Sequence, residues 1–286
     1  MTTPTYSTVA VLGAGTMGAG IAQVCAQAGS KVLLQDLTDD FVQKGLGRIR
    51  DFLQKGVDKG KTTPEQRDAV LARIAVTTDR AAACRGADLV VEAVPEKLEL
   101  KNGLFREVAA VASPDCVLAS NTSSLSLAKV FAGVAGPGRC IGMHFFNPVP
   151  LMALLELVRT DATSPATIDA VTAYSKQLGK EPILVKDSPG FASSRLGVCL
   201  GLEAIRMFES GVASAEDIDK AMVLGYGHPM GPLKLTDLVG LDVRLAIADY
   251  LRKELDHPGF AAPALMRQMV ADGKLGKKTG QGFYRW

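Results

Sequence analysis

The sequence lacks any large imbalance of charge. Among its 286 residues, 32 Lys and Arg stand against 30 Asp and Glu, which gives a formal net charge of +2. A protein that neutralises many nucleic-acid phosphates needs a clear excess of basic residues. We therefore expect no nucleic-acid partner, and any site for an anion must be local.

Cysteine is scarce and never forms a C-x-x-C pair. The five cysteines are far apart in the sequence, each in apolar surroundings: Cys25, Cys84, Cys116, Cys140 and Cys199. An odd number of isolated cysteines is typical of free, buried thiols in a reducing compartment. We predict no metal site.

The chain also lacks a recognisable leader or membrane span. The segment Met1–Tyr6 has neither a basic residue nor an apolar core, so we expect a cytoplasmic protein. Residues 9–28 carry few charges, but glycines and two glutamines interrupt them. This stretch is too polar for a membrane helix, and we predict no membrane partner.

A glycine-rich turn is the most informative feature that is present. It follows the apolar run 7–12 and reads Gly13-Ala14-Gly15-Thr16-Met17-Gly18. Gly13 permits a tight turn out of a strand, Gly15 lets the backbone approach a pyrophosphate, and Gly18 lets the next helix pack closely on the sheet. A helix beginning near Thr16 offers free N–H groups and the positive end of its dipole to phosphates.

An acid ends the next apolar run, as a dinucleotide site requires. Asp36 follows the run 31–35, eighteen residues beyond Gly18. Its carboxylate can accept hydrogen bonds from a ribose diol and would repel a 2′-phosphate. Glycine turns also join strands to helices in proteins that bind no nucleotide. The whole strand, turn, helix and acid together predict a site for NAD rather than NADP.

Apolar runs recur over the first two thirds of the chain, at residues 74–77, 88–92, 116–120, 140–143, 154–158 and 182–185. Such near-continuous runs are typical of strands buried on both faces of a parallel sheet. We predict an α/β domain over 1–186 with a doubly wound, Rossmann-type sheet. The runs 154–158 and 182–185 extend it, and the charged pattern 39–73 predicts an inserted helical hairpin.

Helical periodicity takes over from residue 187. We predict an all-helical C-terminal domain over 187–286, with helices over 191–210, 214–222 and 238–255, the second capped by Ser214. Its broad apolar faces exceed what so small a domain can bury by itself. We therefore expect a homodimer formed through this domain.

A histidine and a glutamate are the candidates for proton transfer. His144 is the only one of three histidines at the end of a predicted parallel strand, and Glu156 lies within the apolar run 154–158. Imidazole can take a proton from an alcohol near neutral pH, and a buried carboxylate needs a hydrogen-bonded partner. The alternative is that His144 is merely hydrogen-bonded while Glu156 faces water from an edge strand.

Five blocks together resemble the L-3-hydroxyacyl-CoA dehydrogenase family, and within it the single-function bacterial branch acting on 3-hydroxybutyryl-CoA. They are residues 13–22, 90–96, 120–124, 144–150 and 276–284. The resemblance covers nearly the whole chain. It implies reversible hydride transfer between NAD and the C3 hydroxyl of a short-chain L-3-hydroxyacyl-CoA.

The resemblance assigns roles in the first domain. It makes His144 the general base and Glu156 its partner, and Ser123 a hydrogen-bond donor to the substrate oxygen and a cofactor contact. Asn147 and Glu96 line the nicotinamide-ribose side.

The resemblance also implies roles for four lysines, and it shows one departure from the family pattern, at Ser194. The resemblance gives Lys101 and Lys278 cofactor contacts, and it gives Lys55 and Lys59 the phosphates of coenzyme A. By spacing alone, these two lysines indicate only a solvated helix face. Ser194 stands where the family usually has asparagine, so its contact to a thioester carbonyl or to the base needs a bridging water or a closer second domain.

Two other functions stay open at this stage. One is a dehydrogenase of a free hydroxy acid or sugar acid that uses the same cofactor domain. The other is a non-catalytic NAD-binding or structural protein, since enzyme folds are reused. The presence of Ser123, His144 and Glu156 argues against the second.

Overall fold

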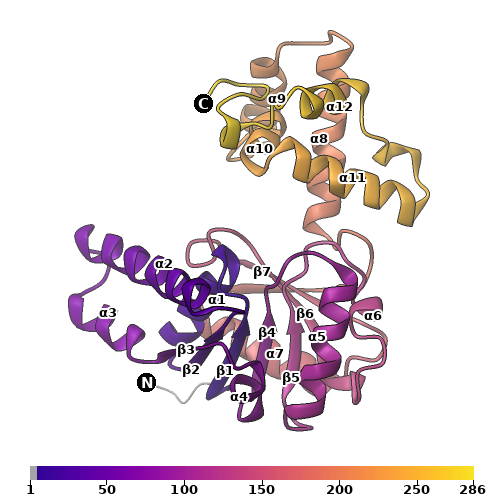
Figure 1. The fold of residues 1–286 in the computed structure, drawn as a ribbon. Coiled ribbons are helices and arrows are strands. Elements are labelled where there is room, and N and C mark those ends of the chain that lie inside the picture. The colour runs from indigo at the N-terminus through magenta and orange to yellow at the C-terminus, as the bar shows by residue number, and fades with distance from the viewer. Residues whose placement is uncertain (1–4) are drawn as a thin grey trace. The chain divides into compact units, whose positions relative to one another are not determined.

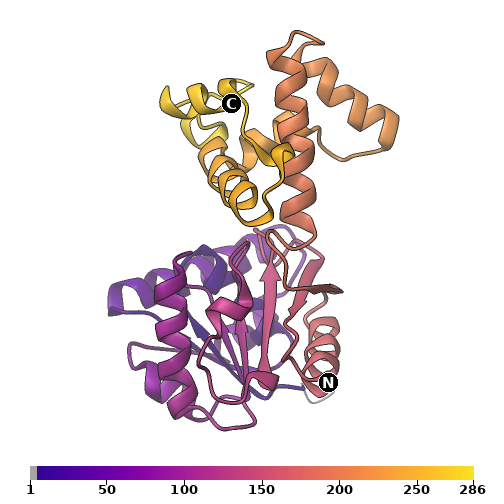
Figure 2. The same ribbon diagram turned by 90° about the vertical axis from the view of Figure 1, so that its right-hand side faces the viewer.

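The computed structural model describes residues 5–286, so the first four residues of the predicted domain 1–186 lie outside it. The chain divides into two compact units, one ending at Asp187 and the other spanning Ser188–Trp286. Figures 1 and 2 show an α/β unit and an all-helical unit, and each is described by itself below.

Within the described residues, the first unit contains one eight-stranded sheet in the order β3-β2-β1-β4-β5-β6-β7-β8. The strands are β1 (Thr8–Leu12), β2 (Lys31–Gln35), β3 (Ile74–Thr77), β4 (Leu89–Glu92), β5 (Val117–Ser120), β6 (Cys140–Phe145), β7 (Leu154–Arg159) and β8 (Glu181–Lys186). All neighbours pair in parallel except β6 and β7, which are antiparallel. The predicted doubly wound sheet with added strands is confirmed.

Helices lie on both faces of this sheet. They are α1 (Thr16–Gln27), α2 (Asp39–Asp58), α3 (Pro64–Leu71), α4 (Arg80–Arg85), α5 (Leu98–Val111), α6 (Leu127–Val130) and α7 (Pro165–Gln177), with a 3₁₀ turn at Pro137–Arg139. Val9 and Val11 of β1 share a core with Ile21 of α1 and Val171 of α7. The intervening β1 residues are equally buried and point to the opposite face, where α4 contacts the strand. Helices α2 and α3 form the predicted hairpin.

The second unit is helical throughout its described length. Its elements are α8 (Ser193–Glu209), α9 (Ala215–Tyr226), α10 (Pro232–Val239), α11 (Leu241–Leu255) and α12 (Ala264–Ala271), with 3₁₀ turns at Pro258–Phe260 and Lys277–Thr279. The Ser214 side chain accepts a hydrogen bond from the backbone N–H of Asp217, so the predicted cap of α9 is present.

The predicted helix 238–255 is confirmed over Leu241–Leu255, but its predicted start is wrong. Gly240 has φ of +105° and separates α10 from α11. A Cβ at this position would lie 3.0 Å from the Asp242 carboxylate and 3.1 Å from Lys278 Nζ. The apolar period continues through the break, and only the glycine marks it, because side chains rarely adopt this backbone conformation.

The cysteine prediction is correct for four positions and wrong for one. All five cysteines are free, and all are buried except Cys199, which is exposed on α8. Burial raises the pKa of the Cys25 thiol to about 12 and that of Cys84 to about 11. Such thiols stay protonated and unreactive at neutral pH.

A buried aspartate anchors the C-terminal tail. The fully buried Asp237 accepts hydrogen bonds from the backbone N–H groups of Phe283 and Tyr284, each at 2.9 Å, and from Trp286 Nε1 at 3.0 Å. The Tyr284 hydroxyl in turn donates to Asp219. The tail is therefore held by charge-assisted hydrogen bonds in addition to apolar packing.

We expect Asp237→Asn to destabilise the second unit by about 2 kcal/mol, because an amide presents one acceptor and turns N–H groups toward the tail donors. Urea unfolding followed by fluorescence of Trp286, the single tryptophan, measures this. The matched control Asp249→Asn removes a solvent-exposed pair with Arg267 and should change stability by less than about 1 kcal/mol. Equal effects of the two substitutions would show that Asp237 does not anchor the tail.

Candidate active site

A cavity of about 740 Å³ opens at the carboxyl ends of three neighbouring strands, β2, β1 and β4. The glycine turn, Asp36 and Val94 are among its lining residues. A Cβ on Gly13 would lie 2.7 Å from the Ala93 carbonyl oxygen, and one on Gly18 would collide with Gly13, whereas Gly15 faces open space. The turn therefore needs two of its glycines for packing and leaves the third beside the cavity.

The start of α1 suits a phosphate. Its N-cap is Gly15, no side chain caps it, and no acid lies in its first turn. Uncapped N–H groups and the helix dipole then favour an anion at this end. Thr16 and Met17, the first residues of α1, also line the cavity. Five of the six residues of the turn, all except Gly18, therefore border it. The residues present therefore fit the pyrophosphate of a dinucleotide.

Asp36 lies at the rim of the same cavity. Its Oδ2 accepts from the backbone N–H of Ala14 and its Oδ1 from that of Leu37, both at 2.7 Å. These bonds fix the carboxylate between the glycine turn and the end of β2. Each oxygen keeps a further lone pair with which it can accept a ribose hydroxyl.

We expect Asp36→Asn to lower the preference for NADH over NADPH by about 10- to 100-fold, because one charge-assisted acceptor and the repulsion of a 2′-phosphate are lost together. The cavity lining also includes Lys44, Arg48 and Arg80, whose charges favour the extra phosphate. Fluorescence titration with each cofactor gives the ratio of dissociation constants. An unchanged ratio would show that Asp36 does not select the cofactor.

His144 and Glu156 lie directly opposite each other in the antiparallel register of β6 and β7. His144 Nδ1 is 2.7 Å from Glu156 Oε2, and the two side chains are 6% and 0% exposed. The His144 ring also packs against Phe146. With Nδ1–H donated to the carboxylate, Nε2 is the nitrogen whose lone pair can take a proton.

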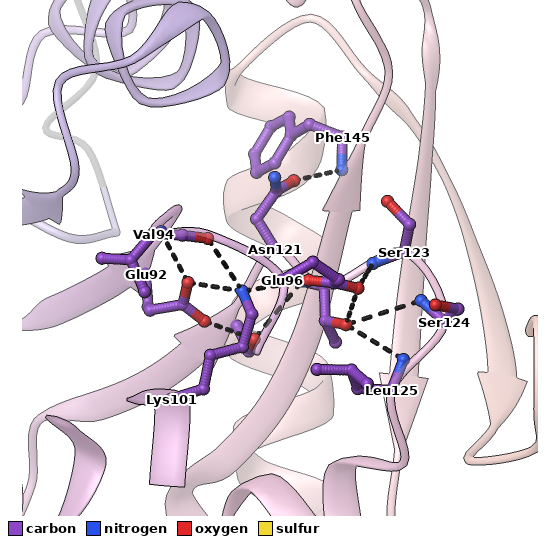
Figure 3. Close-up of polar contacts among 11 residues, drawn as sticks. Glu92, Val94, Glu96, Lys101, Asn121, Ser123, Ser124, Leu125 and Phe145 are labelled. Atoms are coloured by element: carbon purple, nitrogen blue, oxygen red, sulfur yellow. Dashed lines mark hydrogen bonds and ion pairs between the residues drawn. The ribbon is translucent and has the colours of Figure 1, made fainter. Parts of the chain in front are cut away.

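The loop after β5 carries Ser123. Its backbone N–H donates to Glu96 Oε1 at 2.9 Å, and the hydroxyl of Thr122 donates to the same oxygen. Figure 3 shows the Ser123 hydroxyl pointing away from this carboxylate. Asn121 accepts from the backbone N–H of Phe145, which ties the loop to the end of β6, one residue past His144.

Lys101 is more deeply buried than a cofactor contact suggests. Its ammonium group is 1% exposed and lies 2.6 Å from Glu92 Oε1, 3.2 Å from Glu96 Oε2 and 3.3 Å from the Val94 carbonyl oxygen. Sequence reasoning missed Glu92, although an acid at the end of the apolar run 88–92 was a visible signal. Direct contact between Lys101 and a cofactor stays a prediction.

The other predicted residues lie around this centre or in the second unit. Asn147 is exposed and, together with Thr16, lines a smaller cavity of about 100 Å³. Lys55 and Lys59 are exposed on α2 and at its C-terminal cap. Ser194 lies in the first turn of α8, and Lys278 forms an ion pair with Asp242. Their predicted contacts with substrate or cofactor stay predictions.

The loop containing Asn147 is held from β8. Lys180 is 5% exposed and donates to the carbonyl oxygens of Val149 and Met152 at 2.5 and 2.7 Å. Desolvation lowers the pKa of this lysine. The lysine thus fixes the segment that follows His144 without any carboxylate partner among these contacts.

Fold and cavity together define a dinucleotide-binding α/β protein.

No helix among residues 5–286 is both long and apolar enough to cross a membrane. Nor do three or more potential metal ligands gather anywhere in that range.

Comparison with known proteins identifies the family. Residues 8–188 match the 3-hydroxyacyl-CoA dehydrogenase NAD-binding domain, and residues 190–286 match the C-terminal domain of the same family. The chain therefore belongs to the 3-hydroxyacyl-CoA dehydrogenase family, which confirms the resemblance, the enzyme class and NAD as the cofactor.

Individual relatives are similar in sequence over almost the whole chain. A probable 3-hydroxybutyryl-CoA dehydrogenase from Deinococcus radiodurans is 45% identical, with 96% of this chain and 99% of that protein aligned. The mitochondrial hydroxyacyl-coenzyme A dehydrogenase of Sus scrofa is 44% identical over 97% of this chain and 90% of its own. The crystal structure of (S)-3-hydroxybutyryl-CoA dehydrogenase from Ralstonia eutropha superimposes with a TM-score of 0.94 at 44% identity, covering 98% and 99% of the two chains.

Proposed function

We propose that this enzyme oxidises the C3 hydroxyl of short-chain L-3-hydroxyacyl-CoA thioesters, 3-hydroxybutyryl-CoA among them, and catalyses the reverse reduction. The observation that carries the proposal is the buried His144–Glu156 pair. It lies near the carboxyl end of β6, on the sheet edge where the glycine turn follows β1. Ligands of doubly wound sheets bind beyond this edge.

In the proposed mechanism, one side chain transfers the proton and others stabilise the charges that develop. NAD, when bound, supplies the hydride acceptor. His144 Nε2 takes the hydroxyl proton during oxidation and returns it during reduction. Glu156 holds the imidazole in one tautomer and stabilises the imidazolium that forms. Ser123 donates to the oxygen whose charge changes, and Asn147 lines the same side of the site.

Recognition of the coenzyme A moiety is assigned to the helical hairpin. Lys55 and Lys59 are four residues apart on and at the end of α2, exposed on one side of the helix. Two ammonium groups at this spacing suit the phosphates of a nucleotide. Ser194 and Lys278 belong to the second unit, and we assign them roles in substrate and cofactor binding, respectively.

A rate profile tests the substrate class. We expect NADH oxidation with acetoacetyl-CoA and, at equal concentration, a rate with free acetoacetate at least about 100-fold lower, because the thioester's remote binding energy is lost. Longer 3-ketoacyl-CoA substrates then establish chain-length preference. Faster turnover of the free acid would instead establish a hydroxy-acid dehydrogenase.

We further propose a cytoplasmic homodimer formed through the second unit. Large apolar side chains remain exposed there, including Leu196 at 70%, Leu224 at 81% and Tyr226 at 78%. Clusters of this kind mark protein interfaces more often than free surface. Free, buried cysteines suit a reducing compartment. Light scattering after size-exclusion chromatography measures the mass, and a monomer at micromolar concentration contradicts the dimer.

A further inference from the structure

The first unit buries a second ionic pair outside the His144–Glu156 pair. Glu92 ends β4 with its side chain fully buried, and Lys101 of α5 is 1% exposed. Lys101 Nζ and Glu92 Oε1 are 2.6 Å apart. Buried ion pairs contribute little net stability compared with apolar side chains of similar size. The role of this pair is therefore better inferred from the residues that it contacts than from its contribution to stability.

The pair reaches the Ser123 loop through one further carboxylate. Lys101 Nζ lies 3.2 Å from Glu96 Oε2, and the other oxygen of Glu96 accepts from the Thr122 hydroxyl and the Ser123 N–H. Figure 3 shows these groups in sequence, from Glu92 through Lys101 and Glu96 to the loop. A continuous series of ion pairs and hydrogen bonds to charged groups thus joins Glu92, at the end of β4, to Ser123.

Glu92 is the fixed end of this series. Its Oε2 accepts from the Ser120 hydroxyl at 2.6 Å, and its Oε1 also accepts from the backbone N–H of Val94 at 2.7 Å. Ser120 of β5 and the backbone just after β4 therefore hold the Glu92 carboxylate. Glu96, by contrast, has a side chain that is 40% exposed and lies outside any helix or strand. Lys101 connects the buried carboxylate to the partly exposed one.

We propose that Glu92 is a positioning residue that acts through Lys101 to fix Glu96 and the Ser123 loop against the nicotinamide half of the cofactor. The proposal rests on the proposed function, in which Ser123 donates to the reacting oxygen, and on the place beside the nicotinamide ribose that the family resemblance gives Glu96. With Glu92 uncharged, Glu96 is the one carboxylate left beside the Lys101 ammonium in this network. Glu96 then moves toward Lys101 and releases the Ser123 N–H.

The test compares the two halves of the cofactor. For Glu92→Gln we expect NADH to bind about 10-fold more weakly, the loss of about one charge-assisted hydrogen bond. ADP-ribose, which lacks the nicotinamide, should bind within twofold of its wild-type affinity. Turnover with acetoacetyl-CoA should fall about 10-fold as well. The control Glu99→Gln, at an exposed position on α5, should change none of these values.

A merely structural role predicts a different pattern. Damage to the fold would weaken NADH and ADP-ribose equally, and that result overturns the proposal, as does NADH affinity within twofold of wild type. Because Glu92 acts through Lys101, the double variant Glu92→Gln/Lys101→Met should lose no more NADH affinity than Lys101→Met alone. Losses that multiply would refute this route.

Two further measurements test the proposal if Glu92→Gln does not fold and separate it from the proposed function. If Glu92→Gln does not fold, Ser120→Ala keeps both charges, removes one hydrogen bond from Glu92 and removes the longer bond from the Thr122 N–H, and it should weaken NADH binding but not ADP-ribose binding by about threefold. Wild-type turnover of acetoacetyl-CoA is measured first. Its absence would reject the proposed function, while the comparison of NADH with ADP-ribose still decides the role of Glu92.

Discussion

His144→Gln should lower turnover of acetoacetyl-CoA by about 100-fold or more, because the substitution removes the proposed general acid and base. Glutamine is close in size to histidine and can hydrogen-bond Glu156, but it cannot accept a proton at neutral pH. The cofactor cavity does not include residue 144, so NADH affinity should stay within about twofold. Steady-state rates and fluorescence titration measure the two quantities.

A histidine outside the site provides the control. His257 precedes Pro258 in the second unit and is exposed. We expect His257→Gln to retain the wild-type rate. Near-normal turnover by His144→Gln, or an equal loss in both variants, would mean that His144 is not the base.

Glu156→Gln should also reduce turnover by about 100-fold, for an electrostatic reason. The amide keeps one acceptor for His144 Nδ1–H but removes the charge that stabilises the imidazolium. Glu156 is fully buried, so water screens its charge poorly. Removing this charge therefore strongly destabilises the imidazolium. The control Glu181→Gln lies at the start of the neighbouring strand β8, where the side chain is exposed, and should leave the rate unchanged.

The two residues should behave as one unit. The double variant His144→Gln/Glu156→Gln should be no slower than His144→Gln alone, because the proposed role of Glu156 is to act through the imidazole. Rates that fall multiplicatively would indicate that Glu156 has a separate role, for example in the fold of β7.

Local sequence signals predicted the glycine turn and the acid that follows β2, both of which line the cavity. The glycine turn and Asp36 are close in sequence, and each position has a steric or electrostatic requirement that leaves few alternative residues. The structure shows these requirements directly, in the contacts that a Cβ at Gly13 or Gly18 would make. The apolar runs likewise predicted the strands, since burial on both faces leaves little room for polar residues. The run 182–185 forms β8 as predicted, but its expected burial on both faces is wrong, because β8 is an edge strand whose side chains are mostly exposed.

Long-range geometry was harder to predict. The sequence suggested that His144 and Glu156 pair, but the antiparallel register that sets them opposite each other depends on how β7 returns to the sheet. Glu92 was missed because its partners come from β5 and α5, and no periodicity connects them. The break at Gly240 was missed because apolar residues keep the helical period on both sides.

Isotope transfer tests the central claim most directly, since the claim is that hydride leaves C3 of a 3-hydroxyacyl-CoA while His144 takes the hydroxyl proton. The enzyme is mixed with NAD and L-3-hydroxybutyryl-CoA deuterated at C3, and the reduced cofactor is analysed by mass spectrometry and NMR. We predict one deuterium at C4 of the nicotinamide, formed at least about 100-fold more slowly by His144→Gln. Reduced cofactor without deuterium, or equal rates in the two proteins, would contradict the account.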